Sequence, residues 1–583
     1  MGSVVGLITK DQGEATEALD AALTRSPHRG ATIERLRVGR VDLGVTAHRG
    51  EAQLWAGDPW SVAVSGVVDS VAGVDVADSP AGAIASHLAR AGISGLADVL
   101  GDFVVVATDG QRLLAARDHL GTDGLFTGAS GSVGVVASEP KQVSAALGRS
   151  RRPDIEGLVA VYFSQWEAAD DVPSVVRGVA RVPRAGIVEV TPAGWQRRGR
   201  VWDPSRLVES SNLTVAEAKE AVWELTKVVV GSTLTERSAV GLSGGIDSTL
   251  IATAAAAVEG PGVRALSALY PHAPSVDESE YIAATVELLQ MESTTYQPSR
   301  PRLADLEIWV DIVDGPNHGL SLGAISEMND VAAAAGVDNL LGGEMAELVY
   351  DLREHSLSRM LWRGRFGELA GQLRAWRAKG AGWPSMGRSL ASGLAPPRLG
   401  LAYMRRFRPM PDPAVWLDRS YMTGMERHWD LERPARRRWP EIQLFFATGP
   451  SYPGLEIATV MGDAAGVRTR RPLVDRRLWE LFLTFPPEVK FPDFITKSLV
   501  RHVLDGRAPD EVVWRRDKTV FDEDARVRTE TATLLARIQD GFHLPGVRYP
   551  ELIQRLQDGE MSTWEMSMVR TLASIHAFVE VCS

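Results

Sequence analysis

The segment LSGGIDST, residues 242–249, brings two glycines, three hydroxyl side chains and a single acid together. It follows a short apolar run and precedes an alanine-rich stretch, the order expected of a strand, a turn and a helix. Glycines let backbone N–H groups approach an oxyanion closely, and the helix N-terminus adds partial positive charge. The hydroxyls of Ser243, Ser248 and Thr249 add donors. These features predict a phosphate-binding loop.

The acid of this segment, Asp247, needs a reason of its own. It would repel a bare phosphate, so it makes sense chiefly as a Mg²⁺ ligand. The segment lacks the Gly-Lys-Ser/Thr ending of a Walker A loop. The alternative is an ordinary helix cap, in which Asp247 or Ser248 caps the helix and the glycines mark a turn. Taken alone, the segment leaves both interpretations open.

The elements around this segment must carry it to the edge of a sheet. Short apolar runs alternate here with helical patterns. The runs are residues 238–243, 264–270 and 337–343, and the helical patterns are residues 249–258, 278–290 and 324–336. That alternation predicts βαβ units and a parallel sheet. In such a sheet ligands bind beyond the carboxyl ends of the strands, where the segment lies.

The rest of the chain divides into regions of different pattern. Residues 1 to about 200 are rich in Val and Gly and hold short apolar runs bounded by turn residues, which is typical of a β-rich domain. A helical period begins near residue 214. We therefore expect two domains, residues 1–205 and 206–583. Within the second, residues 352–440 are helical in pattern, basic and tryptophan-rich, and form a predicted insert.

Composition excludes several classes of protein. With 583 residues the chain exceeds one ordinary core, and no window approaches the roughly 18 to 20 apolar residues of a membrane helix. The N-terminus lacks a secretion signal, so a cytoplasmic location is expected. The single cysteine, Cys582, excludes intramolecular disulfides and Cys-based zinc sites. A net charge of −11 argues against nucleic-acid binding, although the arginine-rich segment 468–477 is expected to face an anion.

The chain resembles a known family. LSGGIDST resembles the SGGxDS pyrophosphatase loop of N-type ATP pyrophosphatases, and further segments are similar to those of asparagine synthetases in the same order. These are GDFVVVATDGQRLLAARDHLG, VASEPKQV, DESEYIAATVELL, LLGGEMAELVY, GVRTRRPLVDRRL and TKSLVRHVL. The resemblance spans nearly all of the chain except residues 352–440, and it favours the phosphate loop over the cap. It implies an N-terminal Ntn-hydrolase-like α/β sandwich and a C-terminal, doubly wound parallel-sheet ATP pyrophosphatase domain.

The resemblance also implies roles for particular residues. Glu344 matches the glutamate that deprotonates the incoming amine, and Lys497 the lysine that stabilises pyrophosphate and the oxyanion. Glu347 falls where the family has its second metal-binding Asp, beside Asp247, and Asp475 is expected to be structural. Arg470 and Lys518 are weaker candidates for phosphate contact. The residues implied to bind ATP are Leu242, Ser243, Gly244, Gly245, Asp247, Ser248, Ser267 and Gly343.

The chain departs from the family at the glutaminase site. Asparagine synthetases begin Met-Cys-Gly, and the freed Cys hydrolyses glutamine, whereas this chain has Gly2 at that position. The family's oxyanion-hole Asn corresponds to Ser65 in SGVVDS. Without the nucleophile and this donor, glutaminase activity is expected to be absent. The first domain is then a degenerate glutaminase that serves as a scaffold.

Relatives with this profile are β-lactam synthetases, carbapenam synthetases and lasso-peptide cyclases, which all form a lactam within one substrate. The segment LWRGRFGELAGQLRAWRAKG resembles the helical region of lasso cyclases. The resemblance implies a macrolactam synthetase that uses ATP and Mg²⁺, takes a leaderless core peptide as substrate, and works with a leader peptidase. It would adenylate an Asp or Glu side chain and join it to the N-terminal amine, releasing AMP and PPi.

Other functions stay open at this level. A small-molecule β-lactam-forming synthetase is one, although such enzymes usually carry a tyrosine where this chain has Glu344. An ammonia-dependent asparagine synthetase is another, and it would leave the long insert unexplained. A catalytically inactive scaffold that binds nucleotide or peptide is a third, and the retained Asp247, Glu344 and Lys497 argue against it.

Overall fold

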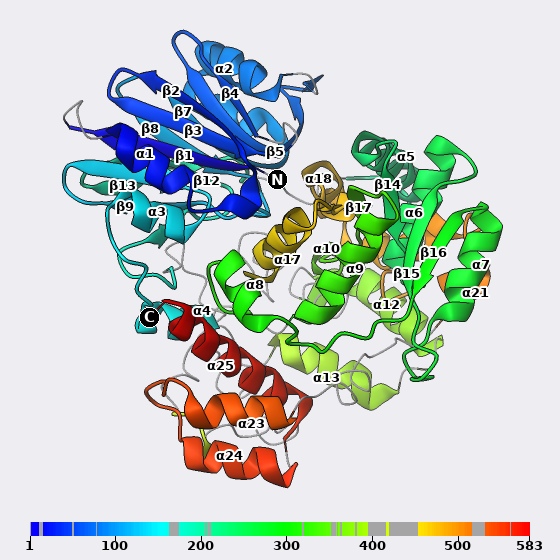
Figure 1. Ribbon diagram of the computed structural model, residues 1–583. Coiled ribbons are helices and arrows are strands. Elements are labelled where there is room, and N and C mark those ends of the chain that lie inside the picture. The colour runs from blue at the N-terminus through cyan, green and yellow to red at the C-terminus, as the bar shows by residue number, and fades with distance from the viewer. Residues whose placement is uncertain are drawn as a thin grey trace.

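The structure is a computed structural model with an antiparallel sandwich at one side and a parallel sheet with helices at the other (Figure 1). Most of the chain is described. The described residues are 2–10, 15–48, 52–76, 79–162, 174–203, 207, 211–317, 320–350, 357, 360–361, 364–378, 380, 382–394, 415–418, 453–515, 531–559 and 561–582. The expected domain boundary at residues 205/206 and the candidate Lys518 lie outside these ranges.

The N-terminal part is built from two antiparallel sheets. The first has the order β11-β9-β10-β1-β3-β2, and the second β13-β12-β8-β7-β5-β4 with β6 paired to β5. The strands are β1 (Ser3–Thr9), β2 (Thr32–Val38), β3 (Val41–Ala47), β4 (Ala52–Trp55), β5 (Ser61–Val71), β6 (Val74–Asp75), β7 (Val99–Thr108), β8 (Leu113–Arg117), β9 (Phe126–Ala129), β10 (Val133–Ala137), β11 (Ala180–Arg181), β12 (Gly186–Thr191) and β13 (Gly194–Arg200).

Helices cover the outer faces of these sheets and complete four layers. Helices α1 (Ala15–Leu23) and α3 (Pro140–Ala146) pack on the first sheet, and α2 (Pro80–Ala91) packs on the second. Strand β1 is buried along its whole length because both of its faces are covered. Val4 and Ile8 face the second sheet, whereas Val5 and Leu7 belong to the cluster beneath the helices. This is the expected α/β sandwich.

The C-terminal part contains a parallel sheet with the order β16-β15-β14-β17-β18. Its strands are β14 (Ser238–Gly241), β15 (Arg264–Ala268), β16 (Glu292–Tyr296), β17 (Asn339–Leu341) and β18 (Arg468–Arg470). Successive strands run outward on one side of β14, and the chain then returns to place β17 on the other side. The strand order therefore reverses between β14 and β17, and ligands bind at such a switch point.

Helices cover both faces of this sheet, which makes it doubly wound as expected. Val240 and Leu341 pack in a cluster with α5 (Val215–Thr233) and α6 (Ile246–Glu259), whereas Ala239 and Leu340 pack with α9 (Leu322–Ala334) on the opposite face. The helix α5 begins where the sequence predicts. The Thr214 hydroxyl accepts from the Glu217 N–H, and the Glu217 carboxylate accepts from the Thr214 N–H, which together form a capping box.

The remaining helices are α4 in the N-terminal part and a larger set in the C-terminal part. They are α4 (Ile155–Tyr162), α7 (Ser279–Leu289), α8 (Leu306–Ile312), α10 (Glu347–Tyr350), α12 (Phe366–Ala378), α13 (Trp383–Leu394), α17 (Pro453–Ala464), α18 (Arg476–Thr484), α19 (Pro487–Lys490), α20 (Ser498–Leu504), α21 (Asp510–Val513), α23 (Thr531–Asp540), α24 (Tyr549–Asp558) and α25 (Thr563–Cys582). The predicted insert is described only in part, chiefly as α12 and α13. Across the described ranges, no helix is both long and apolar enough to cross a bilayer.

The three C-terminal helices, α23 to α25, contain a buried histidine whose pKa is displaced. Nε2 of His576 lies 2.9 Å from the Tyr549 hydroxyl, and the side chain is fully buried. Burial lowers the pKa of His576 from 6.5 to about 4, although the Arg537 carbonyl partly opposes the shift. His576 therefore binds a proton near pH 6.5 in the unfolded chain but only near pH 4 in the folded chain. Stability that is present above pH 6.5 is lost as the pH falls towards 4.

We expect acidification from pH 7 to pH 5 to weaken these helices by about 2 kcal/mol through His576. Hydrogen exchange of α25 at both pH values measures the effect. The variant His576→Gln should be less protected at pH 7 and should change less between the two pH values. An equal loss of protection in the wild type and the variant would contradict the prediction.

Candidate functional site

The predicted phosphate loop joins β14 to α6 at the centre of the parallel sheet. Gly244 has a φ of +78°, and a side chain there would come within 3.1 Å of the Glu278 Cβ, so glycine fits this position best. The hydroxyls of Ser243 and Ser248 lie 3.1 Å apart, and Ser248 Oγ donates to the Gly245 carbonyl at 3.0 Å. These bonds hold the loop in a tight turn over the first turn of α6, whose unpaired N–H groups suit an anion.

The segment that follows β17 lies directly against this loop. A Cβ on Gly343 would be 2.9 Å from the Asp247 Cβ and 3.3 Å from the Ser248 nitrogen. Only glycine allows this approach without displacing the start of α6. Gly343 therefore brings the two loops at the switch point together.

We expect Gly343→Ala to weaken ATP binding about tenfold to a hundredfold, because overpacking of this kind costs about 1–3 kcal/mol. Titration calorimetry with ATP measures the change. Gly371→Ala on α12 is the matched control, since a Cβ there meets no atom within 4 Å. Equal affinities in the two variants would show that the close approach has no bearing on the nucleotide.

A cavity of about 330 Å³ opens between these loops. One side is formed by the phosphate loop and by Gly342, Gly343 and Glu344, and mostly apolar and aromatic side chains, together with Glu278, form the remainder. The lining consists of Gly241, Leu242, Ser243, Gly245, Asp247, Ser248, Leu266, Ala268, Tyr270, Val276, Glu278, Tyr296, Met328, Leu340, Gly342, Gly343 and Glu344. A cavity of this size and mixed character suits a small organic anion with an apolar portion.

Several lining residues were not singled out from the sequence. Tyr270 follows β15, and Tyr296 ends β16, so both lie at carboxyl ends of parallel strands, where ligand contacts are expected. That rule could have found them. Met328 comes from the middle of α9, where no sequence signal sets it apart from a core residue.

Ser267, one of the residues implied to bind ATP, is buried and does not line the cavity, since Leu266 and Ala268 on either side of it do so and strand side chains alternate.

Lys497 reaches the phosphate loop from a distant part of the sequence. Its Nζ forms an ion pair with the Asp247 carboxylate, and both side chains are mostly buried. Lys497 has a φ of +53°, and it immediately precedes α20. Arg501 steadies this turn, because its Nε donates to the Thr496 carbonyl at 2.8 Å. The structure thus brings Asp247 and Lys497 together as the resemblance implies.

Glu344 stands at the rim of the cavity. Its side chain is 53% exposed, and its Oε2 lies 3.7 Å from the Arg471 Nε. A carboxylate that is accessible and adjacent to the phosphate loop can accept a proton from a group held in the cavity. Glu347, the other predicted acid, is exposed at the first residue of α10 and does not line the cavity.

The residues fit a Mg²⁺ ion that is carried by nucleotide phosphates. Within the described residues no group of three or more His, Cys, Asp or Glu side chains could hold a metal ion. Mg²⁺ is commonly bound through one or two carboxylates together with substrate phosphates, and Asp247 on the phosphate loop can supply one of them. Glu347, the other expected metal ligand, lies three residues after Glu344 and outside the cavity lining.

The arginine-rich segment 468–477 corrects an expectation. Its side chains do not gather round the cavity, because carboxylates and carbonyl groups of the protein bind most of them. Arg470 is paired with Asp69 and Asp102, Arg476 with Glu480, and Arg477 with Asp475. Arg470 is therefore not a phosphate ligand here. Asp475 caps α18 by accepting from the Arg477 N–H at 2.8 Å, which is the structural role expected of it.

The region around Gly2 is filled. A Cβ on Gly2 would lie 2.0 Å from the Thr46 carbonyl oxygen and 2.4 Å from the Ala52 Cβ. Ser65 Oγ donates to the Gly2 carbonyl at 3.0 Å, so the two positions that depart from the family lie side by side. Any larger residue at position 2 would have to displace the backbone of β3.

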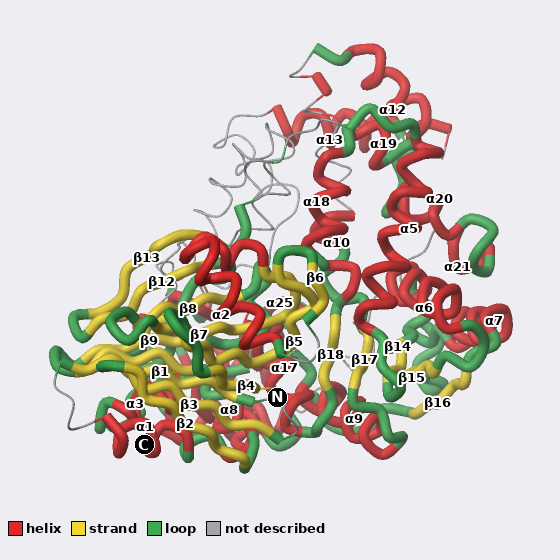
Figure 2. Tube along the Cα trace, turned by 90° about the horizontal axis from the view of Figure 1, so that it is seen from above, coloured by secondary structure: helices red, strands yellow, loops and turns green. Residues whose placement is uncertain are grey.

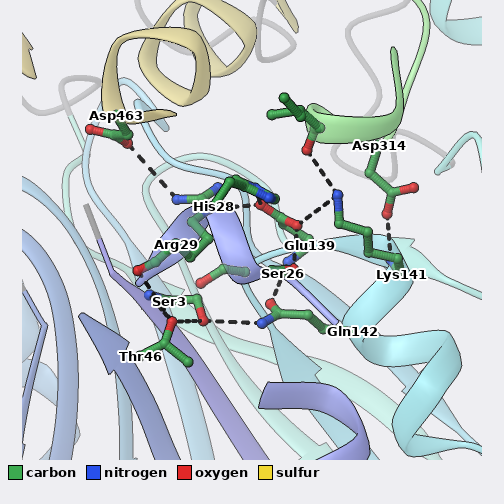
Figure 3. A network of polar contacts seen from close by, with 12 residues as sticks. Ser3, Ser26, His28, Arg29, Thr46, Glu139, Lys141, Gln142, Asp314 and Asp463 are labelled. Atoms are coloured by element: carbon green, nitrogen blue, oxygen red, sulfur yellow. Dashed lines mark hydrogen bonds and ion pairs between the residues drawn. The ribbon is translucent and has the colours of Figure 1, made fainter. Parts of the chain in front are cut away.

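A network of polar side chains surrounds Glu139 and Arg29 (Figure 3), and Nη1 of Arg29 donates to the Gly2 carbonyl at 3.4 Å. Glu139 accepts from Ser26 at 2.5 Å and from Arg29 at 2.7 Å, and Lys141 lies 3.1 Å away. Burial opposes the charge of Glu139, but Lys141, His28 and Arg29 outweigh it and hold its pKa well below the usual value. Ser26, Arg29 and Lys141 thus meet the hydrogen-bonding and charge requirements of the buried Glu139, so this network has a structural role.

The fold and the loop fit an ATP-dependent ligase. Residues 234–577 match the family described as asparagine synthase, which is more than half of the chain. The chain belongs to the asparagine synthase family and is an ATP-dependent, amide-forming ligase. The matched range includes the phosphate loop, Glu344 and Lys497.

Other comparisons add little. No curated protein matches the chain. A solved structure of glutamine phosphoribosylpyrophosphate amidotransferase from B. subtilis, complexed with ADP and GMP, is similar over 58% of this chain and 90% of that chain, with 12% identity and a TM-score of 0.26. A structure of the allosteric regulatory enzyme of purine biosynthesis covers 58% of this chain and 89% of that chain, with 13% identity and the same TM-score. TM-scores this low carry no weight for this chain.

Proposed function

We propose that the chain is a lasso-peptide macrolactam synthetase. A side-chain carboxylate of the core peptide attacks the α-phosphorus of ATP, and pyrophosphate leaves. The N-terminal amine of the same peptide then attacks the acyl carbon, the bond to AMP breaks, and a proton passes from the nitrogen to Glu344. The products are an isopeptide-bonded ring, AMP and pyrophosphate.

One observation carries this proposal: the place of the glutamine-cleaving nucleophile is closed. Gly2 has no side chain, and the Thr46 carbonyl and Ala52 occupy the space that one would need. We therefore expect no ammonia to be released from glutamine in this chain. An amide-forming ligase without its own ammonia supply must take its amine from a substrate, and a lactam results when amine and acid belong to one molecule.

The residues of the cavity suit the steps of this reaction. The N–H groups and hydroxyls of the phosphate loop would bind the ATP phosphates, and Lys497 would offset the negative charge that develops on them. Mg²⁺ bound at Asp247 would supply further positive charge to the same oxygens. Glu344, at the rim, would receive the amine proton, because its exposed carboxylate can reach a group that enters from outside.

The helical insert supports a peptide as substrate. The ring of Trp376 on α12 packs against Phe494 with centroids 4.7 Å apart, and Phe494 lies three residues before Lys497. The insert is therefore attached to the turn that carries the lysine. Trp383 on α13 is 69% exposed, with Arg377 placed over its ring at 6.0 Å. Exposed aromatic and cationic side chains on the insert suit an extended substrate better than a small amino acid.

We propose two further features of this function. A separate peptidase would supply the leaderless core peptide. The chain would act in the cytoplasm, where ATP and the ribosomally made precursor are both present.

Mass spectrometry of a reaction with ATP, Mg²⁺ and a leaderless core peptide tests the proposal. We expect a product that has lost one water, equimolar AMP, and no product with Asp247→Ala. Resistance of the product to carboxypeptidase would show that the tail is threaded. The neighbouring genes provide the candidate peptide.

Other outcomes would favour other functions. AMP release with a small β-amino acid, and none with peptides, would identify a β-lactam-type synthetase. Asparagine formed from aspartate and ammonia would identify an ammonia-dependent asparagine synthetase. No AMP with any carboxylate would contradict catalysis and leave a nucleotide- or peptide-binding scaffold.

A further inference from the structure

Arg470 is held by two carboxylates of the N-terminal sandwich. Its Nη2 lies 3.0 Å and 3.2 Å from the carboxylate oxygens of Asp69, and its Nε lies 2.8 Å from Asp102. All three side chains are largely buried, so the charges are removed from water. A buried guanidinium of this kind needs its partners, because each carboxylate offsets part of the cost of removing the charge from water. Figure 2 shows β18, which ends at Arg470, at the side of the parallel sheet nearest to β5.

The pKa values of Asp69 and Asp102 are shifted in opposite directions. Burial raises the pKa of Asp69, and the neighbouring Asp102 adds to the rise, although Arg470 opposes it. For Asp102 burial also works against the charge, but Arg470 and Arg468 outweigh it and lower the pKa. Both acids stabilise the charge of Arg470: Asp69 accepts two hydrogen bonds from its Nη2, and the Asp102 carboxylate lies beside its Nε.

The sandwich shapes its strands to present these acids. Asp69 is the extra residue of a β-bulge, where the pairing between β5 and β7 shifts between Val68 and Ser70. Opposite the bulge, Gly101 has a φ of +134°, and a Cβ there would lie 2.2 Å from the Val67 carbonyl oxygen. Bulges re-aim side chains, and this one turns Asp69 towards Arg470.

The backbone of Arg470 in turn holds the loop that carries Glu344. Leu341 of β17 is paired with Arg470, and the Gly342 N–H donates to the Arg470 carbonyl at 2.8 Å. The next residue, Arg471, places its Nε 3.7 Å from the Glu344 carboxylate. Since Glu344 is half exposed, little packing restrains its side chain, and its position depends on β18.

We propose that Asp69 and Asp102 are positioning residues for the amide-forming step, and that they fix Arg470 so that β18 holds the Gly342–Glu344 loop in place. The sandwich, which lacks a glutaminase nucleophile, then contributes to the reaction in the other half of the chain. The proposal rests on the function proposed above as far as the role of Glu344 is concerned. A displaced Glu344 slows proton transfer more than ATP binding, because the hydroxyls of the phosphate loop and Lys497 lie on other segments, and only Gly343 of the displaced loop packs against the start of α6.

Asp102→Asn tests this by separating the two steps. Carboxylate-dependent ATP–PPi exchange reports adenylation, and product formation reports amide formation. We expect amide formation to fall about tenfold to a hundredfold, as for a reacting group misplaced by about 1 Å, while exchange stays within about threefold. Asp102→Glu, which keeps the charge, should restore part of the loss.

The matched control is Asp314→Asn, which breaks another buried contact between the sandwich and the synthetase half. Asp314 accepts from Arg151 at 2.8 Å and does not line the cavity. Its replacement should lower thermal stability but leave the ratio of amide formation to exchange unchanged. If Asp102→Asn reduces both steps equally, as a purely structural contact would, the proposal is overturned.

Hydrogen exchange separates this inference from the proposed function. Protection of residues 339–347 should fall in Asp102→Asn and not in Asp314→Asn, whatever the substrate is. If the wild type forms no amide with any substrate while this protection falls as expected, the proposed function fails. The inference that Asp69 and Asp102 hold the Gly342–Glu344 loop through Arg470 then stands. Unchanged protection in Asp102→Asn overturns the inference that these acids hold the Gly342–Glu344 loop.

Discussion

Replacement of Glu344 by glutamine is expected to lower amide formation by about 10²- to 10⁴-fold, the range that a positioned general base contributes. Glutamine has the same shape and its amide oxygen can still face Arg471, which lies 3.7 Å from the carboxylate. It cannot take up the proton that the attacking amine must lose. Adenylation precedes this proton transfer, so ATP–PPi exchange should change far less than product formation.

Product formation and exchange should be measured on the same preparations of Glu344→Gln. Glu368→Gln on α12 is the control, because it is the same substitution at an exposed glutamate whose partner is Arg365. That variant should match the wild type in both measurements. Full amide formation in Glu344→Gln would exclude Glu344 as the base and leave Arg471 with a structural partner only.

The sequence predicts the centre of the site because its signals there are local. An apolar run, two glycines, hydroxyl groups and an alanine-rich helix specify a strand, a turn and a helix, and β14 and α6 have these positions. The alternation that follows predicts β15, β17 and the helices between them. Gly343 and Lys497 could be named only through the family resemblance, since nothing near them in the sequence indicates a nucleotide.

The edges of the parallel sheet were harder to predict. The strand β16 reads ESTTY, with four exposed residues and little apolar character, and β18 reads RTR. Edge strands and strands lined by ion pairs lack the hydrophobic signal on which strand prediction depends. Tyr296, which ends β16, was missed for that reason although it lines the cavity.

The arginine-rich segment shows the limit of charge patterns. Arg470 and its neighbours resemble an anion-binding surface when only the nearby sequence is considered. Their partners, Asp69 and Asp102, lie hundreds of residues away in the sandwich, and only the fold brings them together. A cluster of one charge in a sequence therefore identifies an electrostatic requirement, and the tertiary structure decides whether a ligand or the protein itself fulfils it.

Replacement of Lys497 by methionine is expected to lower ATP–PPi exchange by about 10²- to 10³-fold, the cost of removing one group that stabilises developing charge. Methionine keeps the length of the side chain and removes its ammonium group. The Asp247 carboxylate would then remain in the cavity without its present partner and would repel the nucleotide phosphates. The loss should therefore affect adenylation itself, in contrast to Glu344→Gln.

Lys219→Met is the control, since Lys219 is a surface lysine 3.9 Å from Glu220 on α5 and should leave exchange unchanged. The melting temperature should barely move in Lys219→Met, because exposed ion pairs contribute about 1 kcal/mol or less. The double variant Lys497→Met/Asp247→Asn should be no worse than the more impaired single variant, because groups that act as one unit are not additive. Additive losses would mean that the two residues serve separate steps, and wild-type exchange in Lys497→Met would reduce their contact to a structural ion pair.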